Sequence, residues 1–214
     1  MWNLILTACS SIGFADVFQI SEKNLPKQIT KIHYVSQVNS QPYFGKFAQA
    51  PNSVEAASPL GYSLKYPSSW QRFTTQYSNP EVDIFIVKAL SNSNNEALVT
   101  VTTTVRDFLE VPKDLPPTVS KFEKVAEFYA GIMSRSGYKI YEIKPLMINQ
   151  RKAVVIVTEM PNKKGSITVL LEGKGEKMVV STAIYPLDES IINRQTIEQV
   201  IGEIGEIQNS ITIR

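Results

Sequence analysis

Cysteine and histidine are almost absent from the 214-residue sequence, which contains one of each, Cys9 and His33. A disulfide needs two cysteines, and a zinc site of the Cys/His type needs several such ligands, so both are excluded. His33 precedes the segment that we expect to fold. A Ser-His-Asp or Cys-His catalytic arrangement is therefore not expected.

The sequence also lacks a strong net charge and a long hydrophobic run. Its 22 lysines and arginines stand against 20 aspartates and glutamates, a formal net charge of +2. Nucleic-acid-binding domains are usually much more basic, so we expect no nucleic-acid partner. The apolar stretch over residues 2–9 is shorter than the roughly 20 residues of a membrane-spanning helix. With 43% hydrophobic residues, the composition is typical of a globular protein.

Residues 1–15 are largely apolar and contain no acidic residue, which favours an export signal. Two interpretations stay open. In one, Leu6–Cys9 resembles a bacterial lipoprotein signal, and Cys9 carries the lipid. In the other, Gly13 and Ala15 are the small residues of an ordinary cleavage site. Either predicts an exported protein, periplasmic or anchored on the non-cytoplasmic side of a membrane, although no positive charge precedes the apolar stretch.

Residues 16–58 lose regular patterning and are rich in polar and turn-forming residues, so we interpret them as a weakly structured linker. Residues 59–214 are the expected folded domain. Alternating apolar and polar residues predict strands at 61–66 and 98–105, and residues 82–88 are apolar on both faces, as in a covered strand. Four further strands follow at regular spacing, at 138–143, 152–158, 166–171 and 178–185, separated by turn residues, with a short last strand at 211–213. Helical spacing predicts helices at 120–137 and 188–208.

The connections between the four strands from 138 to 185 are short, and this decides how they pair. A parallel crossover needs about a dozen residues or more, whereas antiparallel neighbours are joined by short turns. We therefore predict an α+β protein with an antiparallel meander. Gly173 and Gly175 fall in one of these turns, so they are turn residues and not a phosphate-binding loop.

The start of the domain carries a motif of glycine, two tyrosines, proline and tryptophan: Gly61, Tyr62, Tyr66, Pro67 and Trp70. A proline stops the strand and fixes a turn, and the tryptophan can fold back as a large apolar lid. The motif resembles the start of the PsbP family, the extrinsic proteins of the photosystem II oxygen-evolving complex and their bacterial relatives. The order of the predicted elements over residues 59–214 is similar to that family too.

The resemblance implies an α/β/α sandwich with a central antiparallel sheet, as in the Mog/PsbP-like fold. It also implies non-enzymatic docking on a membrane-associated protein complex, which in a photosynthetic host is photosystem II on the lumenal side of the thylakoid. Family members help to retain calcium, so the resemblance is the only reason to expect a role for calcium. Plant members bind divalent metals through histidines, and the domain after His33 contains none, so no metal site is carried over.

The charge pattern supplies the candidate docking residues. Residues 139–177 contain eight basic and four acidic residues, whereas residues 186–210 contain one basic and five acidic residues. Such a dipolar surface can steer a protein toward an acidic partner or anionic headgroups. The predicted meander turns present Lys163, Lys164 and Lys174, which we take as the partner-docking residues.

Two alternatives stay open. One is a lipoprotein of the bacterial envelope, anchored through Cys9, whose partner has nothing to do with photosynthesis. The other is a hydrolase that uses a pair of carboxylates. Glu123 and Glu127 lie one helical turn apart, but lysines flank them on the polar face, which favours a solvated surface.

Overall fold

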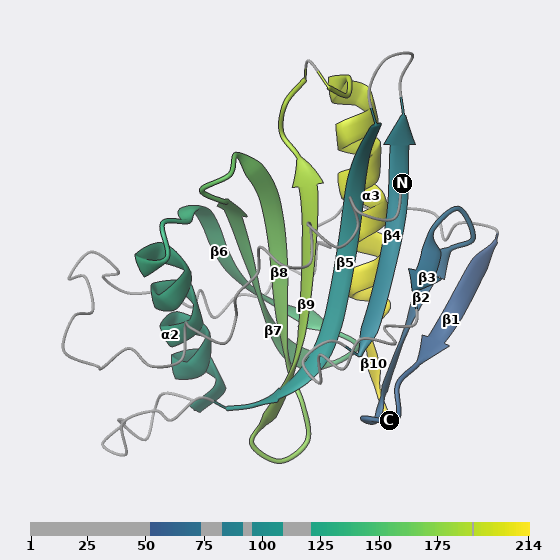
Figure 1. Cartoon of the computed structure of the whole chain (residues 1–214). Helices are drawn as coiled ribbons and strands as arrows, with labels where there is room; N and C mark the ends of the chain where they lie inside the picture. Colours follow the sequence, from purple (N-terminus) through teal and green to yellow (C-terminus); the bar gives the residue numbers. More distant parts are fainter. Residues whose placement is uncertain (1–51, 74–82, 92–95, 109–120, 190) are drawn as a thin grey trace.

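A seven-stranded antiparallel sheet forms the body of the protein (Figure 1). The computed structural model describes residues 52–73, 83–91, 96–108, 121–189 and 191–214. The strands follow the order β3-β4-β5-β9-β8-β7-β6. They are β3 (Gln71–Phe73), β4 (Ile84–Ser91), β5 (Glu96–Asp107), β9 (Lys177–Pro186), β8 (Lys164–Glu172), β7 (Arg151–Glu159) and β6 (Lys139–Ile148).

The four strands β6 to β9 form the meander that the sequence predicts. Each pairs with the next in the chain, and every pairing is antiparallel. Gly137, with φ +82°, ends the preceding helix in the left-handed conformation that glycine adopts without strain. Strand β6 contains a register shift between Ile140 and Glu142, so Tyr141 forms a β-bulge.

A second, three-stranded sheet has the order β1-β2-β10. Its strands are β1 (Ser53–Ala57), β2 (Tyr62–Pro67) and β10 (Thr212–Ile213). Strand β1 lies inside residues 16–58, the segment that we interpreted as a linker. The folded part therefore begins earlier than the expected residue 59, because it already includes Ser53. Five register pairs with β2 hold this mostly exposed strand in place. Residues 16–51 of the expected linker lie outside the described residues.

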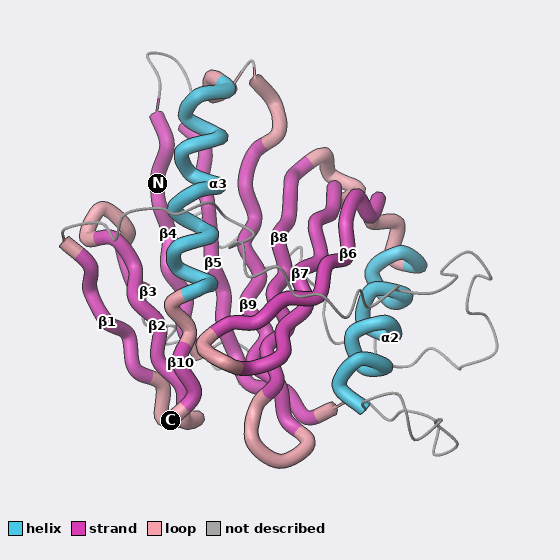
Figure 2. The backbone as a smooth tube through the Cα atoms, turned by 180° about the vertical axis from the view of Figure 1, so that it is seen from behind, coloured by secondary structure: helices cyan, strands magenta, loops and turns pink. Residues whose placement is uncertain are grey.

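The two helices lie on opposite faces of the large sheet (Figures 1 and 2). Side chains alternate along a strand, so two consecutive residues of β7 lie on opposite faces of the large sheet. Val155 belongs to the cluster that contains helix α3 (Arg194–Asn209) and the small sheet, whereas Val154 belongs to the cluster of helix α2 (Lys121–Arg135). The predicted antiparallel sheet with two helices is therefore observed. The complete α/β/α sandwich stays a prediction.

Helix α3 begins at Arg194, six residues later than the sequence pattern indicates. Asn193 is the reason: its side-chain oxygen accepts a hydrogen bond from the backbone N–H of Thr196 at 2.9 Å, which caps the helix. Near the other end, the fully buried Gln208 donates from Nε2 to the carbonyl oxygens of Ile167 and Ser181, both at 3.1 Å. These bonds tie the helix to strands β8 and β9.

Candidate docking surface

Lys163 and Lys164 lie together, and Lys174 lies at the other end of the sheet. Lys163 lies in the turn between β7 and β8, Lys164 is the first residue of β8, and Lys174 belongs to the turn between β8 and β9 (Figure 1). Strand β8 has 9 residues, and a strand rises about 3.3 Å per residue, so roughly 30 Å separate the two turns. Lys174 therefore does not share a surface with Lys163 and Lys164, and the docking role of the three lysines stays a prediction.

The turn that carries Lys174 has two acidic neighbours, one of which has a lysine partner. Glu172 and Glu176 flank Lys174 in the chain, and the Glu176 carboxylate lies 2.6 Å from the ammonium of Lys121. In the next strand, Lys177 lies 3.9 Å from Asp107. Charges of both signs are interleaved here, which gives an acidic partner no favourable field.

A compact cluster surrounds Lys163 at the opposite end. The ammonium of Lys163 lies 2.9 Å from the Glu159 carboxylate, and the phenol of Tyr141 donates a hydrogen bond to the same carboxylate. The ammonium of Lys139 lies 4.7 Å from the centre of the Tyr141 ring, a cation–π contact. We call Lys139, Tyr141, Glu159, Lys163 and Lys164 the Tyr141 cluster.

The electrostatics of the cluster keep its charges fixed. The hydrogen bond from Tyr141, followed by the contact with Lys163, holds the pKa of Glu159 below its ordinary value. The carboxylate in turn raises the pKa of Lys163. Within the described part of the chain neither Lys139 nor Lys164 forms an ion pair. The cluster therefore presents a positive, partly aromatic surface at neutral pH.

Backbone geometry brings the cluster together. Lys163 has φ +62°, so the chain turns sharply before β8. Tyr141 and Glu159 lie on neighbouring strands, and the bulge in β6 sets which way the tyrosine points. The sequence analysis missed Tyr141, Lys139 and Glu159 as site residues because their contacts depend on the register of β6 and β7, for which the sequence carries no local pattern.

The tryptophan motif forms the corner between the two sheets. Gly61 has φ +89°, and its carbonyl accepts a hydrogen bond from the backbone N–H of Arg214 at 2.8 Å. Tyr62 is fully buried, and its phenol donates to the carbonyl of Thr103 in the large sheet at 2.9 Å. Burial, followed by the nearby Asp83, raises the Tyr62 pKa, so its phenol stays protonated.

The rest of the motif makes the turn from β2 into β3. Tyr66 and Pro67 are buried, and the Pro67 carbonyl accepts a hydrogen bond from the backbone N–H of Trp70 at 2.9 Å. This geometry gives each motif residue a structural role.

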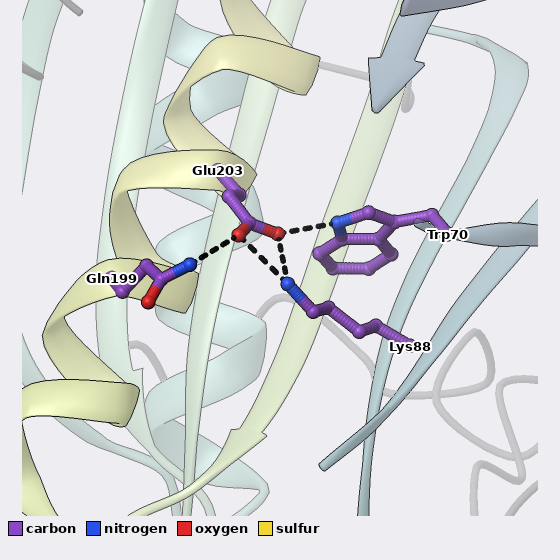
Figure 3. A network of polar contacts seen from close by, with 4 residues as sticks. All are labelled: Trp70, Lys88, Gln199 and Glu203. Carbon is purple, nitrogen blue, oxygen red and sulfur yellow. Dashed lines mark hydrogen bonds and ion pairs between the residues drawn. The ribbon is translucent and has the colours of Figure 1, made fainter. Parts of the chain in front are cut away.

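Trp70 connects this corner to helix α3 through a polar network (Figure 3). Its indole Nε1 donates to the Glu203 carboxylate at 2.7 Å, and Lys88 from β4 lies 2.6 Å from the same group. Gln199, one turn earlier in α3, also donates to Glu203, at 3.1 Å. The side chains of Lys88 and Glu203 are 16% and 17% exposed, so water screens this pair only in part. The Glu203 carboxylate accepts from three side chains that come from three different segments of the chain, so the network is suited to holding the corner.

The remaining candidate residues from the sequence are Cys9 and the carboxylate pair Glu123 and Glu127. Cys9 lies outside the described residues. Glu123 faces Lys152 at 3.4 Å, and Glu127 faces Lys124 at 2.7 Å, so each carboxylate has its own lysine partner. Among the described residues no group of three or more His, Cys, Asp or Glu side chains could hold a metal ion. No helix in this part of the chain is long and apolar enough to cross a membrane.

Comparisons with known proteins give distant structural likenesses. No known family model and no curated protein sequence matches the chain. The solution structure of cyanobacterial PsbP (CyanoP) from Synechocystis aligns with a TM-score of 0.48 and 10% identity, over 79% of this chain and 96% of that one. A Pseudomonas aeruginosa protein of unknown function aligns with a TM-score of 0.36 and 13% identity, over 71% of this chain and 94% of that one. Both TM-scores are low, and neither likeness establishes a shared fold.

Proposed function

We propose that this chain is an exported, PsbP-like protein without enzymatic activity that docks on a membrane-associated protein complex. The tryptophan motif and the order of elements support the family, and in a photosynthetic host the complex is photosystem II or an assembly intermediate of it. Export and lipidation of Cys9 belong to the same proposal. A role for calcium is part of the proposal only because of the family resemblance.

The observation that carries the docking proposal is the one-sided charge of the Tyr141 cluster. Lys139, Lys163 and Lys164 lie at one end of the sheet, and within the cluster Glu159 is the single carboxylate. Exposed charges of one sign steer a partner of the opposite sign and fix its orientation. The mixed charges around Lys174 and the structural role of the tryptophan motif leave this end of the sheet as the best-supported docking surface.

Reversing the charges of Lys163 and Lys164 is expected to weaken docking. In Lys163→Glu/Lys164→Glu we expect the affinity for membranes of the source organism to fall about tenfold or more, because attraction is replaced by repulsion. Co-sedimentation of the purified full chain with those membranes measures the effect. Binding of the unaltered chain should also weaken as salt rises, since screening shortens the range of surface charges.

Lys174→Glu is the matched control, because it makes the same change in another hairpin turn of the same meander. We expect it to bind like the unaltered chain. Equal loss in both variants would show that net charge, rather than this surface, governs binding. Full retention by the double variant would contradict the proposal.

A further inference from the structure

We propose that Tyr141 is the anchor of the docking surface and that it binds a carboxylate-bearing segment of a protein partner, rather than lipid. This inference rests on the proposed docking function and adds the anchoring residue and the chemical class of the partner. It follows from the exposure of Tyr141, from the contacts that fix its ring, and from the charges around it.

Tyr141 is a large aromatic side chain held in place at the surface. Its side chain is 54% exposed, the highest value among the exposed large hydrophobic residues of the described chain. The hydrogen bond to Glu159 fixes the phenol, and the ammonium of Lys139 lies over the ring. A ring that is already ordered loses little conformational freedom when a partner covers it, which is the property of tyrosines that anchor protein interfaces.

The charges around the ring select a carboxylate. Glu159 is already engaged by Tyr141 and Lys163, and Lys139 acts on it only through its charge. Among the described residues the ammonium groups of Lys139 and Lys164 form no ion pair. An incoming Asp or Glu side chain can therefore pair with either lysine while its neighbours in the partner pack on the ring.

The number of basic residues argues against a lipid surface as the partner. Segments that bind anionic lipids by charge usually carry about four to eight lysines or arginines. The cluster has three lysines, and one of them is committed to Glu159. An aromatic anchor flanked by a few charges is instead typical of a protein interface.

The edge of the sheet itself is protected, so the partner should bind side chains and not extend the sheet. Strand β6 is one of the two edge strands of the large sheet, yet it contains the bulge at Tyr141 and also Pro145, which lacks a backbone N–H. Bulges, prolines and lysines are the features that keep edge strands from pairing with another chain. The docking surface is therefore the side-chain surface around Tyr141.

Tyr141→Ala tests the inference, with Met147→Ala as the matched control, because Met147 is 46% exposed on the same strand at its other end. The affinity for membranes of the source organism should fall about tenfold or more in Tyr141→Ala. It should not change in Met147→Ala. Thermal unfolding of both variants checks that they fold. If Tyr141→Ala does not fold, Lys139→Gln replaces it as the test, and it should also weaken binding.

The same experiment separates protein from lipid. Binding of the unaltered chain should be lost on membranes whose surface proteins have been removed by protease, and absent from protein-free vesicles of phosphatidylcholine and phosphatidylglycerol. Vesicle binding as tight as membrane binding would overturn the inference, and so would unaltered binding by folded Tyr141→Ala. If Lys163→Glu/Lys164→Glu weakens binding and Tyr141→Ala does not, this inference alone fails. If the unaltered chain binds no membranes, the proposed function fails with it.

Discussion

Trp70→Ala is expected to lower the free energy of unfolding by about 3–5 kcal/mol, the range seen when a buried aromatic residue is cut back to alanine. Trp70 is 2% exposed and packs in the core cluster shared by the two sheets and helix α3. Its removal leaves a cavity and also takes away the indole donor of the Glu203 carboxylate. Urea unfolding followed by circular dichroism measures the loss.

Trp70→Phe separates packing from hydrogen bonding. It keeps an aromatic ring at the corner but lacks the N–H group, so we expect a loss of about 1.5–3 kcal/mol, as for a hydrogen bond to a charged group. A loss below about 1 kcal/mol in Trp70→Ala would be far less than burial of this side chain requires. It would contradict the assignment of the motif as the packed corner between the sheets.

Gly165→Ala is expected to destabilise the protein by about 1–3 kcal/mol, the usual effect of adding a methyl group to a filled core. Gly165 in β8 pairs with Tyr185 in β9, and a Cβ atom on Gly165 would come within 2.4 Å of the Tyr185 ring. Both residues are buried, so the ring has little room to move away. The midpoint of urea unfolding should fall accordingly.

Ser166→Ala is the matched control for this change, because it alters the next residue of the same strand. Ser166 is 1% exposed, and its hydroxyl has no hydrogen-bond partner in the described part of the chain. Removing an unpaired buried hydroxyl is close to neutral or stabilising. If Gly165→Ala were as stable as the unaltered protein, the close contact with Tyr185 would be wrong.

Much of the fold follows from residue patterns. The regularly spaced apolar segments 152–158 and 166–171 and the short turn between them predict the meander, and the structure confirms it as β7 and β8. Strand β3 was missed because it has three residues, of which two are exposed, directly after the Trp70 turn. Strand β1 was missed because one residue of its five is buried, which is too few to show a period.

The separation of the candidate lysines was implicit in the predicted meander. In an antiparallel meander successive turns alternate between the two ends of the sheet. Lys163 and Lys174 lie on successive turns, so they had to lie apart. Charge counts along the chain hide this, because they add residues that the fold places at opposite ends. Tyr141, in contrast, could not have been found, since its bulge and its contact with Glu159 arise only once β6 and β7 are paired.

The most direct test of the docking account is photo-crosslinking from two turns of the sheet. A photoreactive amino acid replaces Asn162, the exposed neighbour of Lys163, in one variant and Lys174 in another, and each is irradiated on membranes of the source organism. We predict a covalent adduct with a membrane protein from position 162 and none from position 174. Adducts from position 174 alone, or adducts with lipid alone, would contradict docking of a protein partner at the Tyr141 cluster.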